Sequence, residues 1–131
     1  MRGAAGFTLI ELLIVVVIIG ILALAALPMI TDNTKDAKKA EATMYLGTIK
    51  ERIRTYYMNN GNDASGIGSL AALLDVNELQ GEYYDSGNYV LVVVTVNTAT
   101  IRALANVASG APQVTLDITD VRSGLSTLSS P

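Results

Sequence analysis

The 131-residue chain contains no cysteine, no histidine and no tryptophan. Without cysteine it can form no disulfide, so its C-terminal region must be held by packing or by neighbouring molecules. Without cysteine and histidine, most nucleophile–base pairs and most zinc sites are excluded. The part after Ile30 holds 8 basic and 11 acidic residues. It therefore lacks the excess of positive charge that is typical of nucleic-acid-binding domains. The composition therefore argues against an enzyme, a cofactor or metal site, and a nucleic-acid partner.

Charge is nearly absent from one long stretch. Residues Phe7–Ile30 form an apolar run with a single charged residue, Glu11. The 21 residues Phe7–Leu27 would form a helix of about 32 Å, close to the ~30 Å hydrocarbon layer of a bilayer. A carboxylate at bilayer depth costs about 2.5–3.5 kcal/mol or more when it is unpaired. The run therefore predicts a transmembrane helix whose Glu11 needs a partner.

The start of the run, with the glycine before it, carries a specific motif. The string GFTLIE, residues 6–11, resembles the processing site of type IV prepilins and pseudopilins, and the likeness continues to Pro28. The resemblance implies that residues 1–6 are a leader, that a prepilin peptidase cleaves between Gly6 and Phe7, and that Phe7 becomes N-methylphenylalanine. It also implies that Glu11 pairs with the N-terminal amine of a neighbouring subunit in a filament. In a lone subunit we expect only the chain's own Phe7 amine near Glu11.

Two residues weaken the predicted membrane helix, which spans residues 7–30. Gly20 lowers helix propensity, and Pro28 removes a backbone donor. We expect this part of the helix to soften in a filament but not in the free subunit.

Two simpler classes of apolar segment fit this run less well. A secretory signal peptide has a shorter apolar core, and a simple signal anchor accounts for neither the GFTLIE string nor Glu11. A count of basic residues, Arg2 against Lys35, Lys38 and Lys39, would place the large domain in the cytoplasm. The family resemblance places it outside the inner membrane, and we follow the more specific signal.

Residues 31–59 continue the helix with one apolar face. Joined to the run, the predicted helix extends over Phe7–Asn59, about 80 Å at the usual rise. Tyrosines 45, 56 and 57 could form a charge-transport stripe, but tyrosine at helical spacing is more often core. The positions of the apolar face are Ala42, Tyr45, Leu46, Ile49, Ile53, Tyr56 and Tyr57.

A polar, glycine-rich loop is predicted over residues 60–88. It would contain a short helix at residues 70–74, which Ser69 could cap, and an irregular part from Glu78 to Asn88. Carboxylates at positions 63, 82 and 85 could bind calcium, as in the major pseudopilins of type II secretion. The ligand spacing of a calcium loop is missing, so solvated loop charges account for Asp63, Glu82 and Asp85 better.

Residues 89–119 are predicted to form an antiparallel meander of three strands, or four. The first, 89–96, is apolar on both faces, as in a central strand, although nothing in the chain obviously covers its second face. A turn at Asn97-Thr98 precedes the second strand, 100–104, and the third, 113–119, places Asp117 outward. Residues 120–131 are expected to be a loose tail or a subunit contact. A hydrolase using Asp117 and Asp120 is a weak alternative, since both residues fit surface charges.

The sequence thus predicts an α+β, type IV pilin-like fold. Its long N-terminal helix would pack by its second half on a small β-meander in a globular domain, residues 31–131. The function implied by the resemblance is a structural subunit of a type IV pilus. Its partners would be copies of itself, with or without minor pilins, the prepilin peptidase, an inner-membrane assembly platform, and the bilayer before assembly. The alternatives are a pseudopilin of a type II secretion or competence system, with a periplasmic pseudopilus, and a membrane-anchored binding or sensor domain.

Overall fold

The computed structural model describes residues 6–131, apart from the side chains of residues 27–32 and 76. The predicted leader therefore lies outside the described residues, except for Gly6. The chain divides into two compact units, the first ending at Thr34 and the second covering Lys35–Pro131. Helix α1, Leu9–Asn59, contributes to both units, and with the sheet that follows it confirms the predicted α+β fold.

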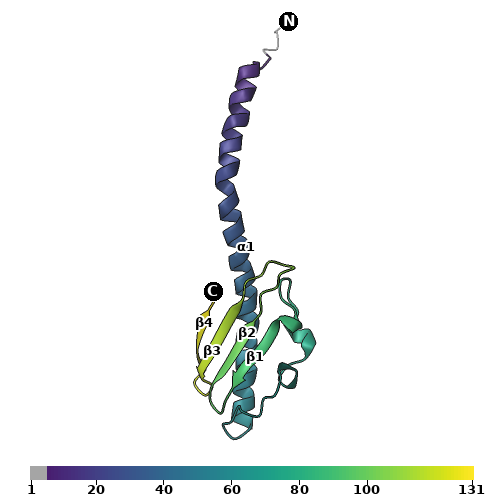
Figure 1. The fold of residues 1–131 in the computed structure, drawn as a ribbon, viewed down its shortest axis with the longest axis vertical. Helices are drawn as coiled ribbons and strands as arrows, with labels where there is room; N and C mark the ends of the chain where they lie inside the picture. Colours follow the sequence, from purple (N-terminus) through teal and green to yellow (C-terminus); the bar gives the residue numbers. More distant parts are fainter. Residues whose placement is uncertain (1–5) are drawn as a thin grey trace. The chain divides into compact units, whose positions relative to one another are not determined.

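In the second unit, α1 covers one face of a four-stranded antiparallel sheet (Figure 1). The strands follow the order of the chain across the sheet: β1 Tyr89–Val94, β2 Ala99–Ala103, β3 Val114–Asp120 and β4 Leu125–Ser129. Residues at the predicted helical spacing enter the core between helix and sheet. Fully burying an aliphatic side chain contributes about 1.5–3 kcal/mol, so this face holds α1 on the sheet. The buried residues of α1 are Ala42, Leu46, Ile49, Ile53 and Tyr57.

The predicted tyrosines of α1 belong to this core. Tyr57 is buried, and Tyr45 and Tyr56 are partly buried against the same cluster. From the sheet, Ile101 of β2 and Leu116 of β3 meet them. Tyrosine at helical spacing is therefore core here, as we expected.

Strand β1 differs from its prediction. It is an edge strand and not a central one, and it ends at Val94, before the turn in which the Thr95 N–H donates to the Thr98 carbonyl (2.8 Å). Its Val92 and Val93 are 44% and 51% exposed. An apolar pattern on both faces of a strand shows that both faces favour burial, but it does not show that residues of the same chain cover them.

The C-terminal segment also differs from its prediction. It is not a loose tail, because Leu125–Ser129 forms strand β4, which pairs with β3 along Thr115–Asp120. This edge strand is mostly exposed and carries serine and threonine, so its hydrophobic pattern is weak.

The segment between α1 and β1 is less irregular than predicted. It contains three 3₁₀ turns, at Leu70–Ala72, Val76–Leu79 and Ser86–Asn88. The first replaces the short helix expected at residues 70–74. Ser69 occupies its N-cap position without making a side-chain capping hydrogen bond.

Candidate processing and assembly site

The predicted cleavage site lies just in front of α1. Gly6 and Phe7 have non-helical backbone, and Phe7 is 82% exposed. No other part of the described chain comes within 4 Å of the position where a Cβ on Gly6 would stand. Nothing in the described chain therefore blocks access of a peptidase to the Gly6–Phe7 bond.

Thr8 and Glu11 start α1 together. Both the backbone N–H and the hydroxyl of Thr8 donate to Oε2 of Glu11, at 2.8 and 2.7 Å. The Glu11 N–H in turn donates to the Thr8 hydroxyl at 3.4 Å. Since Leu9 is the first helical residue, Thr8 is the N-cap and Glu11 the third helical residue, the pattern of a capping box.

This geometry corrects one expectation for Glu11. In the single chain, Glu11 has donors other than the Phe7 amine, because Thr8 supplies two. Among the described residues, its Oε1 has no hydrogen-bond partner. Sequence reasoning missed Thr8, although threonine followed three residues later by glutamate is a known helix-start signal.

The first turns of α1 continue into an apolar surface. Residues Leu9–Ala26 have a mean hydropathy of 3.1, none of them is buried, and the helix is long enough to cross a membrane. The helix runs through Gly20, beside which a Cβ would meet open space, and through the backbone of Pro28. The side chain of Pro28 lies outside the described residues.

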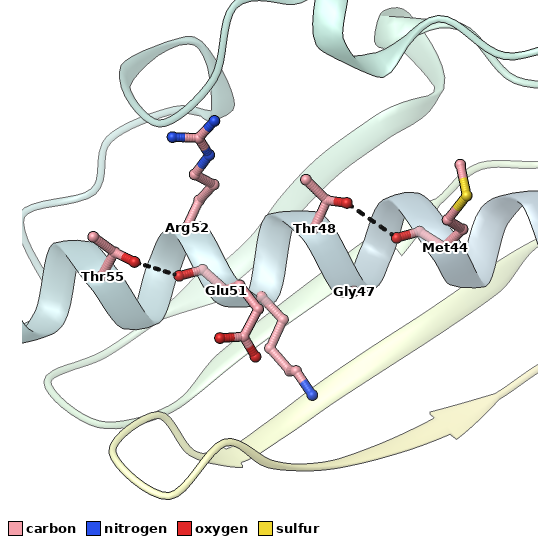
Figure 2. Close-up of a pocket in the computed structure, with 7 residues that line it drawn as sticks. Met44, Gly47, Thr48, Glu51, Arg52 and Thr55 are labelled. Atoms are coloured by element: carbon pink, nitrogen blue, oxygen red, sulfur yellow. Dashed lines mark hydrogen bonds between the residues drawn. The ribbon is translucent and has the colours of Figure 1, made fainter.

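In the second unit, an exposed part of α1 combines small or methyl-bearing residues with charged ones (Figure 2); the charged ones are Lys50, Glu51 and Arg52. The Thr48 hydroxyl donates to the Met44 carbonyl (3.3 Å), and the Thr55 hydroxyl to the Glu51 carbonyl (2.9 Å). Because these hydroxyls bond within the helix, the face presents methyl groups beside Gly47 and the 61% exposed Met44.

Glu41 ties the connecting segment to α1. Its carboxylate accepts the backbone N–H groups of residues 82, 83 and 84, at 3.0, 3.0 and 2.9 Å. A Cβ on Gly81 would lie 2.1 Å from Oε1 of Glu41, so a side chain here would displace the carboxylate from its hydrogen bonds. The Tyr45 hydroxyl adds a bond to the Gln80 carbonyl at 2.7 Å.

Two further side chains of α1 contact later parts of the second unit. Lys38 donates to the Ser109 carbonyl at 2.6 Å and lies 5.5 Å from the ring centre of Tyr83. Arg52 forms a salt bridge with Glu78 at 3.0 Å. Both sides of that bridge are exposed, so it contributes about 0–1 kcal/mol.

Hydrogen bonds hold the β3–β4 hairpin, which has no cysteine to form a disulfide. The Ser123 hydroxyl and the Arg122 N–H donate to the Asp120 carboxylate at 2.7 and 3.0 Å. These donors, the Ser123 hydroxyl foremost, hold the pKa of Asp120 below its usual value of 3.8. The turn needs positive φ at Gly124 (75°), which glycine adopts without strain.

Three other carboxylates weighed for chemistry, those of Asp63, Asp85 and Asp117, have local structural partners. Asp63 accepts the Ser65 N–H at 2.7 Å, and the Ser65 hydroxyl and this N–H hold the pKa of Asp63 below its usual value. Asp85 caps a 3₁₀ turn, and Asp117 accepts the Thr100 hydroxyl at 2.7 Å. Across the described residues, no three His, Cys, Asp or Glu side chains lie together as a metal site.

Comparisons with known proteins point to one family. The family described as the prokaryotic N-terminal methylation motif matches residues 1–27. A fimbrial protein of Neisseria meningitidis serogroup B is 39% identical over 94 residues, which cover 72% of this chain and 55% of the relative. The type IV major pilin PilE1 of Neisseria gonorrhoeae is 39% identical over 94 residues, 69% of this chain and 42% of the relative.

A third organism contributes a further relative. The type IV wide pilus major component PilA4 of Thermus thermophilus is 40% identical over 73 residues, 56% of each chain. The chain spans about half the length of the curated relatives it matches. No solved structure matches.

Proposed function

We propose that this chain, a member of the type IV pilin family by its N-terminal methylation motif and its similarity to major pilins, is a structural subunit of a pilus. One observation carries the proposal. The GFTLIE string overlaps the start of an 18-residue apolar helical span, Leu9–Ala26, that no part of the described chain buries. Such a surface needs either a bilayer or copies of itself, and a filament subunit uses both in turn.

In this proposal the chain is first an inner-membrane protein with its second unit on the outer side. A prepilin peptidase then cleaves between Gly6 and Phe7 and methylates Phe7. An assembly platform moves the subunit into a helical homopolymer, with or without minor pilins, that extends outside the cell. The subunit has no catalytic role, in keeping with the structural character of its relatives.

A pilus is favoured over a pseudopilus. The relatives described above are named fimbrial protein, type IV major pilin and type IV wide pilus component. A pseudopilin of a type II secretion or competence system shares the processing signal, so it stays the alternative.

The test combines two measurements on cells that produce the chain with its assembly system. Intact mass should show a mature protein that begins at Phe7 with one added methyl group. Electron microscopy should show surface filaments that antibodies to the chain label. A Gly6→Ala variant should accumulate as uncleaved precursor in the membrane, and assembled filaments that retain Met1 would contradict the proposal.

A further inference from the structure

The loop between β2 and β3 presents an apolar tip that no part of the described chain covers. Val107 is 93% exposed, more than any other large hydrophobic residue of the described chain. We propose that this tip contacts the bilayer surface while the subunit is still in the membrane, before assembly. The inference rests on the proposed function, which places the apolar helical span in that bilayer.

Hydrogen bonds hold the loop in one shape. The backbones of Asn106 and Ala111 exchange two hydrogen bonds, at 3.1 and 3.0 Å. Within the turn that they close, the Gly110 N–H donates to the Val107 carbonyl at 3.3 Å. The Asn106 side-chain amide donates to the Tyr83 carbonyl at 2.8 Å, which ties the loop to the connecting segment. Because these bonds fix the turn, Val107 stays at its tip, where removing its side chain from water would be favourable.

The loop is attached to the end of the second unit where α1 enters that unit. The Lys38 ammonium donates to the Ser109 carbonyl at 2.6 Å, and the unit begins at Lys35. The apolar run ends at Ile30, eight residues before Lys38. Eight residues span at most about 29 Å when fully extended, and less as a helix. The attachment of the loop therefore stays close to the bilayer in any placement of the two units.

The same end of the second unit carries another apolar side chain and positive charge. Leu128 of β4 is 51% exposed and lines a hollow with Lys39 and with Val114, the first residue of β3. Residues 35–39 contain three lysines and one aspartate, and among the described residues none of these lysines forms an ion pair. Anionic headgroups attract lysine near a membrane, while apolar side chains enter the boundary between headgroups and acyl chains. The apolar tip and the lysines together therefore fit the surface of a bilayer that contains anionic lipids.

A single introduced tryptophan tests the contact, because the chain has none of its own. Val107→Trp is compared with Val96→Trp, a matched control at a 55% exposed valine between β1 and β2, at the opposite end of the sheet (Figure 1). The full-length protein is reconstituted in vesicles of phosphatidylethanolamine and phosphatidylglycerol. Brominated lipids should quench the fluorescence of Val107→Trp at least about twofold more than that of Val96→Trp, and its emission should lie at shorter wavelength.

The charge of the lipids and of the protein supplies a second comparison. Vesicles of phosphatidylcholine alone should quench Val107→Trp less, and so should anionic vesicles when Lys39→Gln is added. Lys50→Gln is the control for that substitution, because Lys50 lies farther along α1 among other residues, and it should leave the quenching unchanged.

The outcomes separate the inference from the proposed function. Equal quenching at positions 107 and 96, or quenching that does not depend on lipid charge, would overturn the inference. Protection from water that appears only at a high ratio of protein to lipid would assign the tip to a second copy of the chain and would overturn it as well. If the wild-type protein did not float with the vesicles at all, the membrane step of the proposed function would fail instead.

Discussion

The contact between Glu41 and Gly81 makes a quantitative prediction about the second unit. Glu41→Ala removes three hydrogen bonds to the backbone of residues 82–84. Hydrogen bonds to a charged group contribute about 1.5–3 kcal/mol each, but water replaces part of each bond at this half-exposed site. We therefore expect the free energy of unfolding to fall by about 2–4 kcal/mol.

Gly81→Ala tests the same contact from the other side. The new Cβ would lie 2.1 Å from Oε1 and 2.5 Å from Cδ of Glu41, distances at which the Glu41 carboxylate must shift away from its hydrogen-bond partners. Overpacking of this kind costs about 1–3 kcal/mol. In the Glu41→Ala background both overlaps vanish, and the next nearest contact is the Tyr45 ring at 3.0 Å. Gly81→Ala should then cost less than about 1 kcal/mol.

The measurement is a double-variant cycle on the full-length protein in detergent. Chemical denaturation can be followed by tyrosine fluorescence, since Tyr83, Tyr84 and Tyr89 lie at or near the contact and the chain has no tryptophan. The two substitutions should be coupled by about 1 kcal/mol or more, with the double variant more stable than additivity predicts. Gly87→Ala is the matched control, because its Cβ would meet only Asp85, at 3.2 Å. Additive costs within error would refute the proposed clash.

Three further predictions concern assembly and the hairpin. Glu11→Ala and Glu11→Gln should abolish or severely reduce filaments at a normal membrane level, and Glu11→Asp should keep some, as counted by electron microscopy and immunoblot. The pKa of Asp120 is depressed in the folded chain, so its contribution to stability is present above pH 3.8 and is lost as pH falls through the folded value. With Asp120→Asn, the melting temperature should fall less steeply as the pH drops below about 4. An unchanged dependence of the melting temperature on pH in this range would contradict this prediction. A filament map should show lost helicity between Gly20 and Pro28, and unbroken helical hydrogen bonds there would refute that prediction.

The sequence predicted the parts of the fold that repeat a strong local pattern. The core positions of α1 recur every three or four residues, and Val114, Leu116 and Ile118 of β3 alternate as predicted and are buried. A fourth strand was left open, but β4 was not located, because Leu125–Ser129 has little apolar pattern and lies exposed at an edge. Local pattern also could not show that β1 is an edge strand, since coverage of a face depends on the whole topology.

The candidate site was only partly predictable for a similar reason. Thr8 and Glu11 are three residues apart, so their capping box was visible in the string GFTLIE. Glu41 and its partners are separated by 41 to 43 residues, and no local signal links a helix carboxylate to backbone N–H groups so far along the chain. Contacts of this kind depend on the folded chain.

The capping box sharpens the question of why residue 11 is charged. Glutamine at the third helical position can complete a capping box as glutamate does, so helix capping accounts for the shape of the side chain but not for its charge. A charge at bilayer depth costs about 2.5–3.5 kcal/mol or more when it is unpaired. Two neutral donors from Thr8 offset part of that cost and leave the charge itself. In the proposed filament, the amine of a neighbouring Phe7 would offset the remaining cost of the charge. It would do so only at the axial offset between subunits that brings the amine to Oε1 of Glu11. Glu11→Gln therefore separates the two roles: the helix should still begin at Leu9, while the penalty that selects one register should be gone.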